Sequence, residues 1–97
     1  MNATRLLAAL VVLAGCGPGR SGRERLGDEA WHDGRWSEAV ADYRAAGDSP
    51  RLTAKLADAA LEGRLWTVSA IAWTKLGTDA PDRAAEAAAG LARVAIA

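Results

Sequence analysis

Large and small residue types recur along this chain at a spacing of 30 positions. Trp36 has a counterpart in Trp66, and Tyr43 has one in Trp73. The other matched pairs are Leu26 with Leu56, Gly27 with Ala57, Ala30 with Ala60, Ala39 with Ser69, and Gly47 with Gly77. A fixed period of this length is typical of stacked helical units, each of which buries its apolar face against the next. The repeat therefore constrains the fold more than any single motif does.

Within the first unit, the segment 34–47 has the period of an amphipathic helix. Large residues and alanines at positions 36, 39, 40, 43 and 46 fall on one face, and the opposite face carries Glu38, Asp42 and Arg44. The segment 65–76 has the corresponding pattern in the second unit. We expect Trp36, Tyr43, Trp66 and Trp73 to lie in the core.

Prolines, glycines and one serine predict the helix boundaries. Pro50 and Pro81 suit the first turn of a helix, where the missing N–H has no partner to lose, and Ser49 is placed to cap the helix that begins at Pro50. Gly47 and Gly77 suit the left-handed residue after a helix end. Gly34 and Gly63 punctuate the inner turns. The pattern predicts an all-α protein with helices over 23–33, 36–46, 50–62, 65–76 and 82–96, joined by short loops as antiparallel neighbours.

Composition excludes several classes of function. The 97 residues allow one domain, and 12 basic residues balance 12 acidic ones, so no charge surplus points to nucleic acid. The chain has one His and one Cys, whereas metal centres and disulfides need several ligands or a second thiol. A site built on His32, or a carboxylate pair formed by Asp28 and Asp58, is the remaining catalytic option. We expect no enzyme activity, no metal and no cofactor.

The N-terminal segment has the features of a targeting signal. Arg5 precedes an apolar run over 6–14, which is about half of the roughly 20 residues that a helix needs to cross a bilayer. The sequence Leu13-Ala14-Gly15-Cys16 resembles the lipobox of bacterial lipoproteins. This resemblance implies a signal peptide over 1–15, acylation of Cys16, and a flexible tether over 16–22. The alternatives are a free Cys after an ordinary signal peptide, or a buried N-terminal helix.

The first helical unit resembles a tetratricopeptide repeat. The matching positions are Leu26, Gly27, Gly34, Trp36, Ala39, Tyr43, Ala46 and Pro50. Ala30 stands where the family has Tyr, and Pro50 comes one place early. The second unit matches more loosely. The resemblance implies a short tetratricopeptide-like array of about two helical hairpins plus a C-terminal helix over 23–97; the alternative is an unrelated five-helix bundle.

The family resemblance also implies where a partner would bind. In such arrays the first helix of each unit lines a concave groove that holds a peptide or protein segment. The corresponding positions here are Glu24, Asp28, Trp31 and His32 in unit one, and Arg51, Ala54, Asp58, Leu61 and Glu62 in unit two. We expect a mostly acidic groove with Trp31 as an apolar platform. Alternatively, Trp31 covers a seam between helices.

The combined hypothesis is a lipid-anchored adaptor of the bacterial cell envelope that binds a protein or peptide partner. Gly17 follows the lipidated position, which by resemblance implies the periplasmic side of the outer membrane. The last helix carries Leu91, Val94 and Ile96 among many alanines and few charges. This face predicts packing against another chain, so a self-associating, homo-oligomeric envelope lipoprotein without a ligand groove is the alternative.

Overall fold

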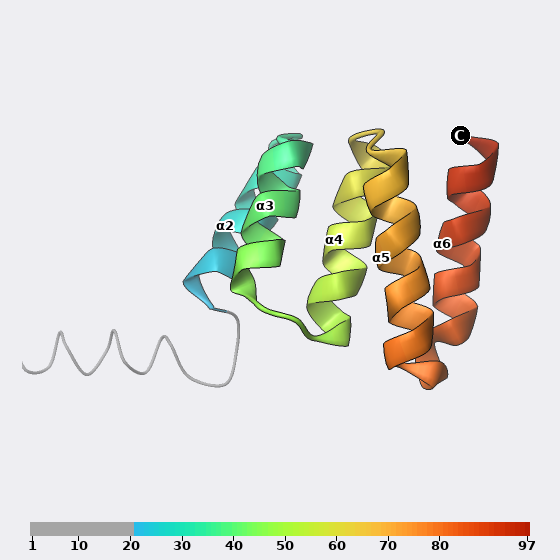
Figure 1. Cartoon of the computed structure of the whole chain (residues 1–97). Coiled ribbons are helices and arrows are strands. Elements are labelled where there is room, and N and C mark those ends of the chain that lie inside the picture. The colour runs from blue at the N-terminus through green and yellow to red at the C-terminus, as the bar shows by residue number, and fades with distance from the viewer. Residues whose placement is uncertain (1–20) are drawn as a thin grey trace, which may run out of the picture.

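The computed structural model describes residues 21–97 and shows an array of helices (Figure 1). The elements are α2 (Gly22–His32), α3 (Trp36–Ala46), α4 (Pro50–Glu62), α5 (Trp66–Asp79), the short 3₁₀ helix η1 (Pro81–Arg83) and α6 (Ala84–Ile96). Strands are absent from this part of the chain. The all-α prediction, with two helical hairpins and a C-terminal helix, is confirmed. The predicted signal peptide, Cys16 and most of the tether lie outside the described residues.

Serine side chains begin the first helix of each hairpin. The Ser21 hydroxyl accepts a hydrogen bond from the backbone N–H of Glu24 at 3.1 Å. The Ser49 hydroxyl accepts one from the N–H of Leu52 at 3.2 Å, and Pro50 occupies the first turn. Each cap satisfies an N–H that has no partner within the helix. The predicted roles of Ser49 and Pro50 are therefore confirmed.

The two hairpin turns have the same hydrogen bonds 30 residues apart. The N–H groups of residues 33, 34 and 35 bond to the carbonyls of 29, 31 and 30, and those of residues 63, 64 and 65 bond to 59, 61 and 60. The left-handed position is held by Gly34 (φ 73°) in the first turn and by Arg64 (φ 61°) in the second. Gly63 lies in this second turn as expected, as the C-cap of α4, and its φ is −82°. A Cβ on Gly63 would lie 2.5 Å from the Cβ of Trp36, so this glycine permits contact between hairpins.

The predicted end of the fourth helix was wrong. Gly77 was expected to follow the last helical residue, but α5 continues through it to Asp79. A Cβ at Gly77 would lie 3.3 Å from the Cβ of Ala87 in α6. The helix ends at Asp79, and Ala80 is its C-cap directly before Pro81, because the residue that precedes a proline is disfavoured in helical conformation. Pro81 then opens η1, and α6 starts at Ala84 instead of residue 82.

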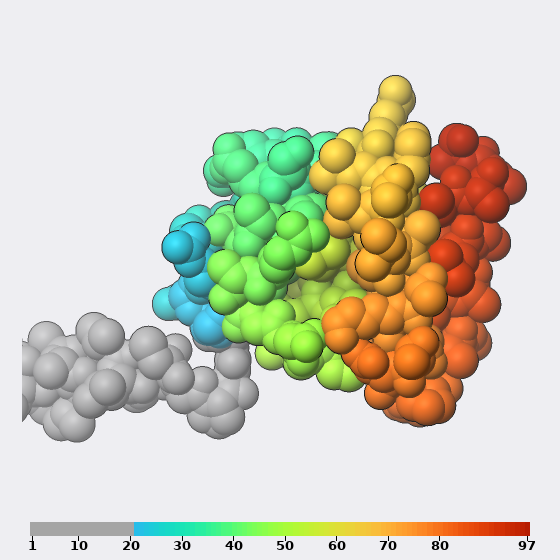
Figure 2. Space-filling model, viewed as in Figure 1, coloured from blue at the N-terminus to red at the C-terminus, as the bar shows by residue number. Residues whose placement is uncertain are grey.

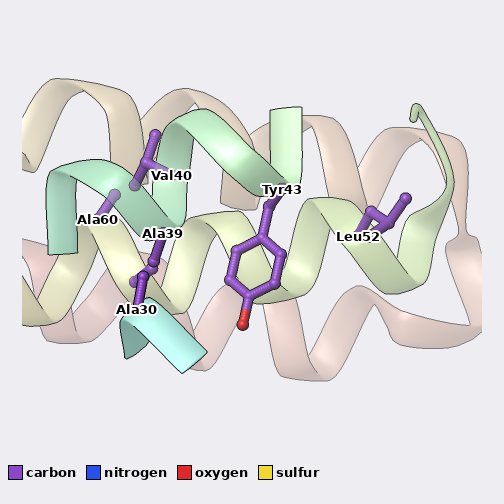
Figure 3. Close-up of a cluster of buried hydrophobic side chains, with 7 residues drawn as sticks. Ala30, Ala39, Val40, Tyr43, Leu52 and Ala60 are labelled. Atoms are coloured by element: carbon purple, nitrogen blue, oxygen red, sulfur yellow. The ribbon is translucent and has the colours of Figure 1, made fainter. Parts of the chain in front are cut away.

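The core consists of two clusters of buried side chains joined at α4. The first lies between α3 and its neighbours, and Figure 3 shows the Tyr43 ring between the alanines and Leu52. Its buried members are Ala30, Ala39, Val40, Tyr43, Leu52, Ala59 and Ala60. The second lies between α4, α5 and α6 and comprises Ala54, Ala57, Ala72, Trp73, Leu76, Ala80 and Ala87. Leu56 packs against both clusters. Alanines let the helix axes approach closely, and the aromatic rings fill the remaining space.

The core prediction held for two of the four large aromatic positions. Tyr43 and Trp73 are 3% and 4% exposed. Trp36 is half-buried against Gly63. Trp66 was expected in the core but is 39% exposed. At the repeat spacing, the counterpart of Gly63 is Arg93, so the glycine contact that Trp36 makes has no equivalent at Trp66.

Candidate functional site

Side chains of α2 and α4 meet on one face of the array, where the sequence predicted a groove. The buried member is Glu24, whose side chain is 1% exposed. It accepts hydrogen bonds from Arg51 and, at 2.7 Å, from the Nζ of Lys55. Burial raises the pKa of Glu24, but the hydrogen bonds and positive charges of Lys55 and Arg51 outweigh that effect, and the pKa lies below its usual value. The ionised carboxylate of Glu24 therefore links the first hairpin to the second.

Asp28 forms the centre of the site one turn further along α2. The Tyr43 hydroxyl donates to Asp28 Oδ1 at 2.6 Å, and Lys55 Nζ donates to the same oxygen at 3.0 Å. Lys55 Nζ also lies 5.7 Å from the centre of the Tyr43 ring, within cation–π range. Burial and the hydrogen bond to Asp28 raise the pKa of Tyr43, so its hydroxyl stays protonated and remains a donor.

Trp31 links the polar residues to an aromatic cluster at the tip of the first hairpin. Its indole Nε1 donates to Asp58 Oδ2 at 3.2 Å. Its ring makes edge-to-face contacts with Trp36 and His32, at centroid separations of 5.8 and 5.9 Å. Trp31 thus bridges α2 and α4, and its ring remains partly exposed.

A depression of about 340 Å³ lies among these side chains. The residues that line it are Asp28, Trp31, His32, Tyr43, Lys55 and Asp58. Carboxylates, an ammonium group and an aromatic ring thus face the same space. Such a surface can accept and donate hydrogen bonds while it offers an apolar contact, which suits a peptide segment better than a purely ionic ligand.

The α6 helix extends this face beyond α4. Arg93 lies 3.6 Å from Glu62 and 4.0 Å from Asp58. Asp58 therefore lies between Trp31 of α2 and Arg93 of α6. Both of these ion pairs are largely solvent-exposed, so each contributes little stability.

The expectation of a mostly acidic groove did not include the cations that pair with its carboxylates. Each predicted acid has a cationic neighbour: Glu24 and Asp28 pair with Lys55, while Asp58 and Glu62 pair with Arg93. Lys55, Arg93 and Tyr43 are members of the site that the sequence reasoning missed. A signal for Lys55 was available, because it lies one helical turn after Arg51 and therefore on the same face.

The other predicted groove residues differ in what they offer a partner. His32 is exposed beside Trp31, whereas Leu61 is only 7% exposed and Ala54 only 8%. These two residues therefore contribute packing and little binding surface. Among residues 21–97, no group of three His, Cys, Asp or Glu side chains is placed to hold a metal ion.

Comparison with known proteins identifies no relative. No family model matches the chain, and no curated protein or solved structure matches it either. The tetratricopeptide and lipoprotein resemblances therefore depend on the residues quoted for each of them.

Proposed function

We propose that this protein is a lipid-anchored adaptor of the bacterial cell envelope that binds a protein or peptide segment on the face shared by α2 and α4. The observation that carries this proposal is the depression beside Trp31, where an exposed aromatic edge adjoins Asp28, Lys55 and Asp58. Tryptophans in such places are frequent hot spots of protein binding, because a large ring can be desolvated at low entropic cost.

The charges around the depression favour a peptide over a small inorganic ion. Asp28 and Asp58 can accept hydrogen bonds from peptide N–H groups, while Lys55 can donate to peptide carbonyls. Because these side chains are already paired with one another, a strongly charged ligand would have to break existing ion pairs. A segment of mixed polarity with an apolar side chain for Trp31 avoids that cost.

The anchor in this proposal is the lipobox at Cys16. In the described part of the chain no helix has the length and apolar character needed to cross a membrane. Acyl chains at Cys16 would supply stable membrane attachment, since two or more chains are sufficient where one is not. A short tether from Cys16 to the start of α2 at Gly22 would keep the helical domain near the bilayer surface.

Site-directed photocrosslinking in the host tests the binding face. Benzophenone-bearing residues would replace His32, beside the depression, and Ser37, an exposed residue of α3 that serves as the matched control. We expect one stoichiometric foreign adduct from position 32 and none from position 37. Equal crosslinking at both positions, or adducts containing only this chain, would contradict an adaptor.

The anchor has a separate test. Mass spectrometry of the mature N-terminus should find an acylated Cys16, and Cys16→Ser should release the protein from membranes. An unmodified N-terminus, or continued membrane attachment of the variant, would remove the lipoprotein part of the proposal and leave the binding face untouched.

Self-association is the second candidate, and one observation favours it. The outer side of α6 is exposed along its length and ends in Ile96, which is 85% exposed. If this helix pairs with a second copy, Ile96→Lys should convert an oligomer to a monomer in light scattering. A wild-type protein that is already monomeric at high concentration would exclude this candidate.

A further inference from the structure

A second hollow lies on the face formed by α3 and α5, away from the depression beside Trp31. Figure 2 shows these two helices as ridges with α4 lower between them. The hollow has a volume of about 310 Å³. Leu52 and Leu56 of α4 form its floor, and Val68 and Ile71 of α5 form one wall. The tetratricopeptide resemblance assigns nothing to this groove.

The groove leaves apolar surface exposed. Ile71 is 65% exposed, more than Trp66 at 39% or Leu26 at 48%. Leu56 and Val68 beside it are half-buried. Removing one large aliphatic side chain from water is worth about 1.5–3 kcal/mol. A partner that covers Ile71 and fills the groove would therefore gain favourable binding free energy from the burial of this apolar surface.

The charged side chains at the rim of the groove differ in whether they are already paired. Lys75 lies 3.1 Å from Asp48 across the end of the groove and 2.5 Å from Asp79 on its own helix. These three charges neutralise one another in part. Arg44 lines the same groove and is exposed, but within residues 21–97 its side chain has no hydrogen bond or ion pair. The groove thus combines an apolar floor with one unpaired cation.

The shape of the groove decides between two kinds of anionic apolar ligand. Sites for small amphiphiles enclose most of the ligand surface. This groove is open along the side facing solvent (Figure 2), so a flexible acyl chain would remain half in water. An amphipathic helix brings its own polar face and needs cover on one side only.

We propose that the groove between α3 and α5 binds an amphipathic helix of a partner protein, which presents a bulky apolar side chain and a carboxylate on one face. The apolar side chain packs against Ile71, Leu56 and Val68, and the carboxylate pairs with Arg44. This inference is independent of the proposed function, because it concerns a different face and needs neither the lipid anchor nor the depression beside Trp31.

Selection from a displayed library of stapled helical peptides tests the proposal on the full chain in lipid nanodiscs. Enriched peptides are expected to share a large apolar residue and an Asp or Glu one helical turn away. Ile71→Ser should weaken their binding about tenfold, as loss of an apolar hot spot does. Arg44→Glu should weaken it about fivefold, in line with one exposed ion pair, and a Lys in place of the peptide acid should restore it.

Arg25→Glu is the matched control, because Arg25 is an exposed arginine on α2, and it should leave the affinity unchanged. Circular dichroism checks that the variants fold, which we expect since both side chains are exposed. Enriched helices without an acid, or with affinities that neither substitution alters, would overturn the proposal. Arg44-dependent binding of decanoate without selection of any helix would also overturn it, in favour of a small amphiphile.

Discussion

The two hairpins share a backbone but differ in how they accommodate their largest side chains. In α2–α3 the ring of Tyr43 lies against Gly27 of the same hairpin, where an added Cβ would be 2.6 Å from the ring. In α4–α5 the counterpart of Gly27 is Ala57, and Trp73 lies instead against Gly90 of α6, where an added Cβ would be 2.2 Å from the ring. The two rings thus meet glycines in different places: Tyr43 meets one in its own hairpin, and Trp73 meets one in the following helix.

The polar groups of these two aromatic side chains also differ between the hairpins. The Tyr43 hydroxyl donates to Asp28, whereas the indole N–H of Trp73 is buried without a hydrogen-bond partner in the described residues. An unsatisfied buried donor costs about 1–3 kcal/mol. Trp73 therefore contributes through apolar contact alone, whereas Tyr43 combines apolar contact with a hydrogen bond. We expect substitutions that separate α5 from α6 to have the largest effects.

The largest expected effect is the loss of the Trp73 ring. Trp73→Ala should lower the free energy of unfolding by about 3–5 kcal/mol, because it opens a cavity at the junction of α4, α5 and α6. Trp66→Ala, at the matched exposed position, should cost under about 1 kcal/mol. Urea denaturation followed by circular dichroism measures both. Similar losses at the two positions would refute the asymmetry between them.

A side chain at Gly90, which lies directly against the Trp73 ring, should also destabilise the protein. Gly90→Ala places a methyl group against the buried ring, and overpacking of this kind costs about 1–3 kcal/mol, offset by about 1 kcal/mol of helix propensity. Gly77→Ala is the control, since its Cβ meets only Ala87 at 3.3 Å, and it should be neutral or mildly stabilising. The double variant Gly90→Ala/Trp73→Leu should recover part of the loss relative to Trp73→Leu alone; strict additivity would argue against direct contact.

The contacts of Glu24 between the hairpins should make the free energy of unfolding depend on pH. Glu24→Gln leaves Arg51 without a carboxylate partner and Lys55 with Asp28 alone, and it should cost about 1–3 kcal/mol at neutral pH. Because folding lowers the pKa of Glu24, the wild type is stabilised above the ordinary glutamate pKa and loses this contribution as pH falls through the folded value. The stability of Glu24→Gln should therefore fall less between neutral and acid pH.

Glu38→Gln is the control for that series. Glu38 pairs with Arg35, but both side chains are about half-exposed or more, at 61% and 47%, so the change should cost under about 0.5 kcal/mol. Stability measured in the same buffers should keep the wild-type dependence on pH. An unchanged pH dependence in Glu24→Gln itself would exclude Glu24 as its source.

The fold could be predicted from the sequence because the informative residues determine structure within their own helix or turn. Ser49 and Pro50 fix a helix start through a cap and a missing N–H, and the period of large and small residues defines the faces. The end of α5 was misplaced because Gly77 is compatible with a helix interior, and its role in passing close to Ala87 depends on tertiary packing. The residues that flank a glycine do not show whether it is needed for a turn or for close packing between helices.

The site was harder to predict because its charges pair between helices. Glu24, Asp28 and Asp58 were identified as groove positions, but their partners come from residues 15 to 35 positions away in the chain. Lys55 could have been placed by helical spacing from Arg51. The contact of Arg93 with Asp58 depends on how α6 lies against the array, which no local pattern specifies. Leu61 shows the converse limit, since a position assigned to the groove is buried by neighbouring helices.

The smallest expected effect concerns the two hairpin turns, which have matched hydrogen bonds but different residues at the left-handed position. The left-handed conformation costs a non-glycine residue about 1 kcal/mol, while glycine loses more conformational entropy on folding. Arg64→Gly should therefore stabilise by a few tenths of a kcal/mol, and Gly34→Arg should destabilise by up to about 1 kcal/mol. Thermal melts of the two variants and of Arg64→Gly/Gly34→Arg measure the difference. Because the turns lie in separate hairpins, the effects should add; a destabilised Arg64→Gly would mean that the arginine side chain makes a stabilising contact that outweighs its backbone strain.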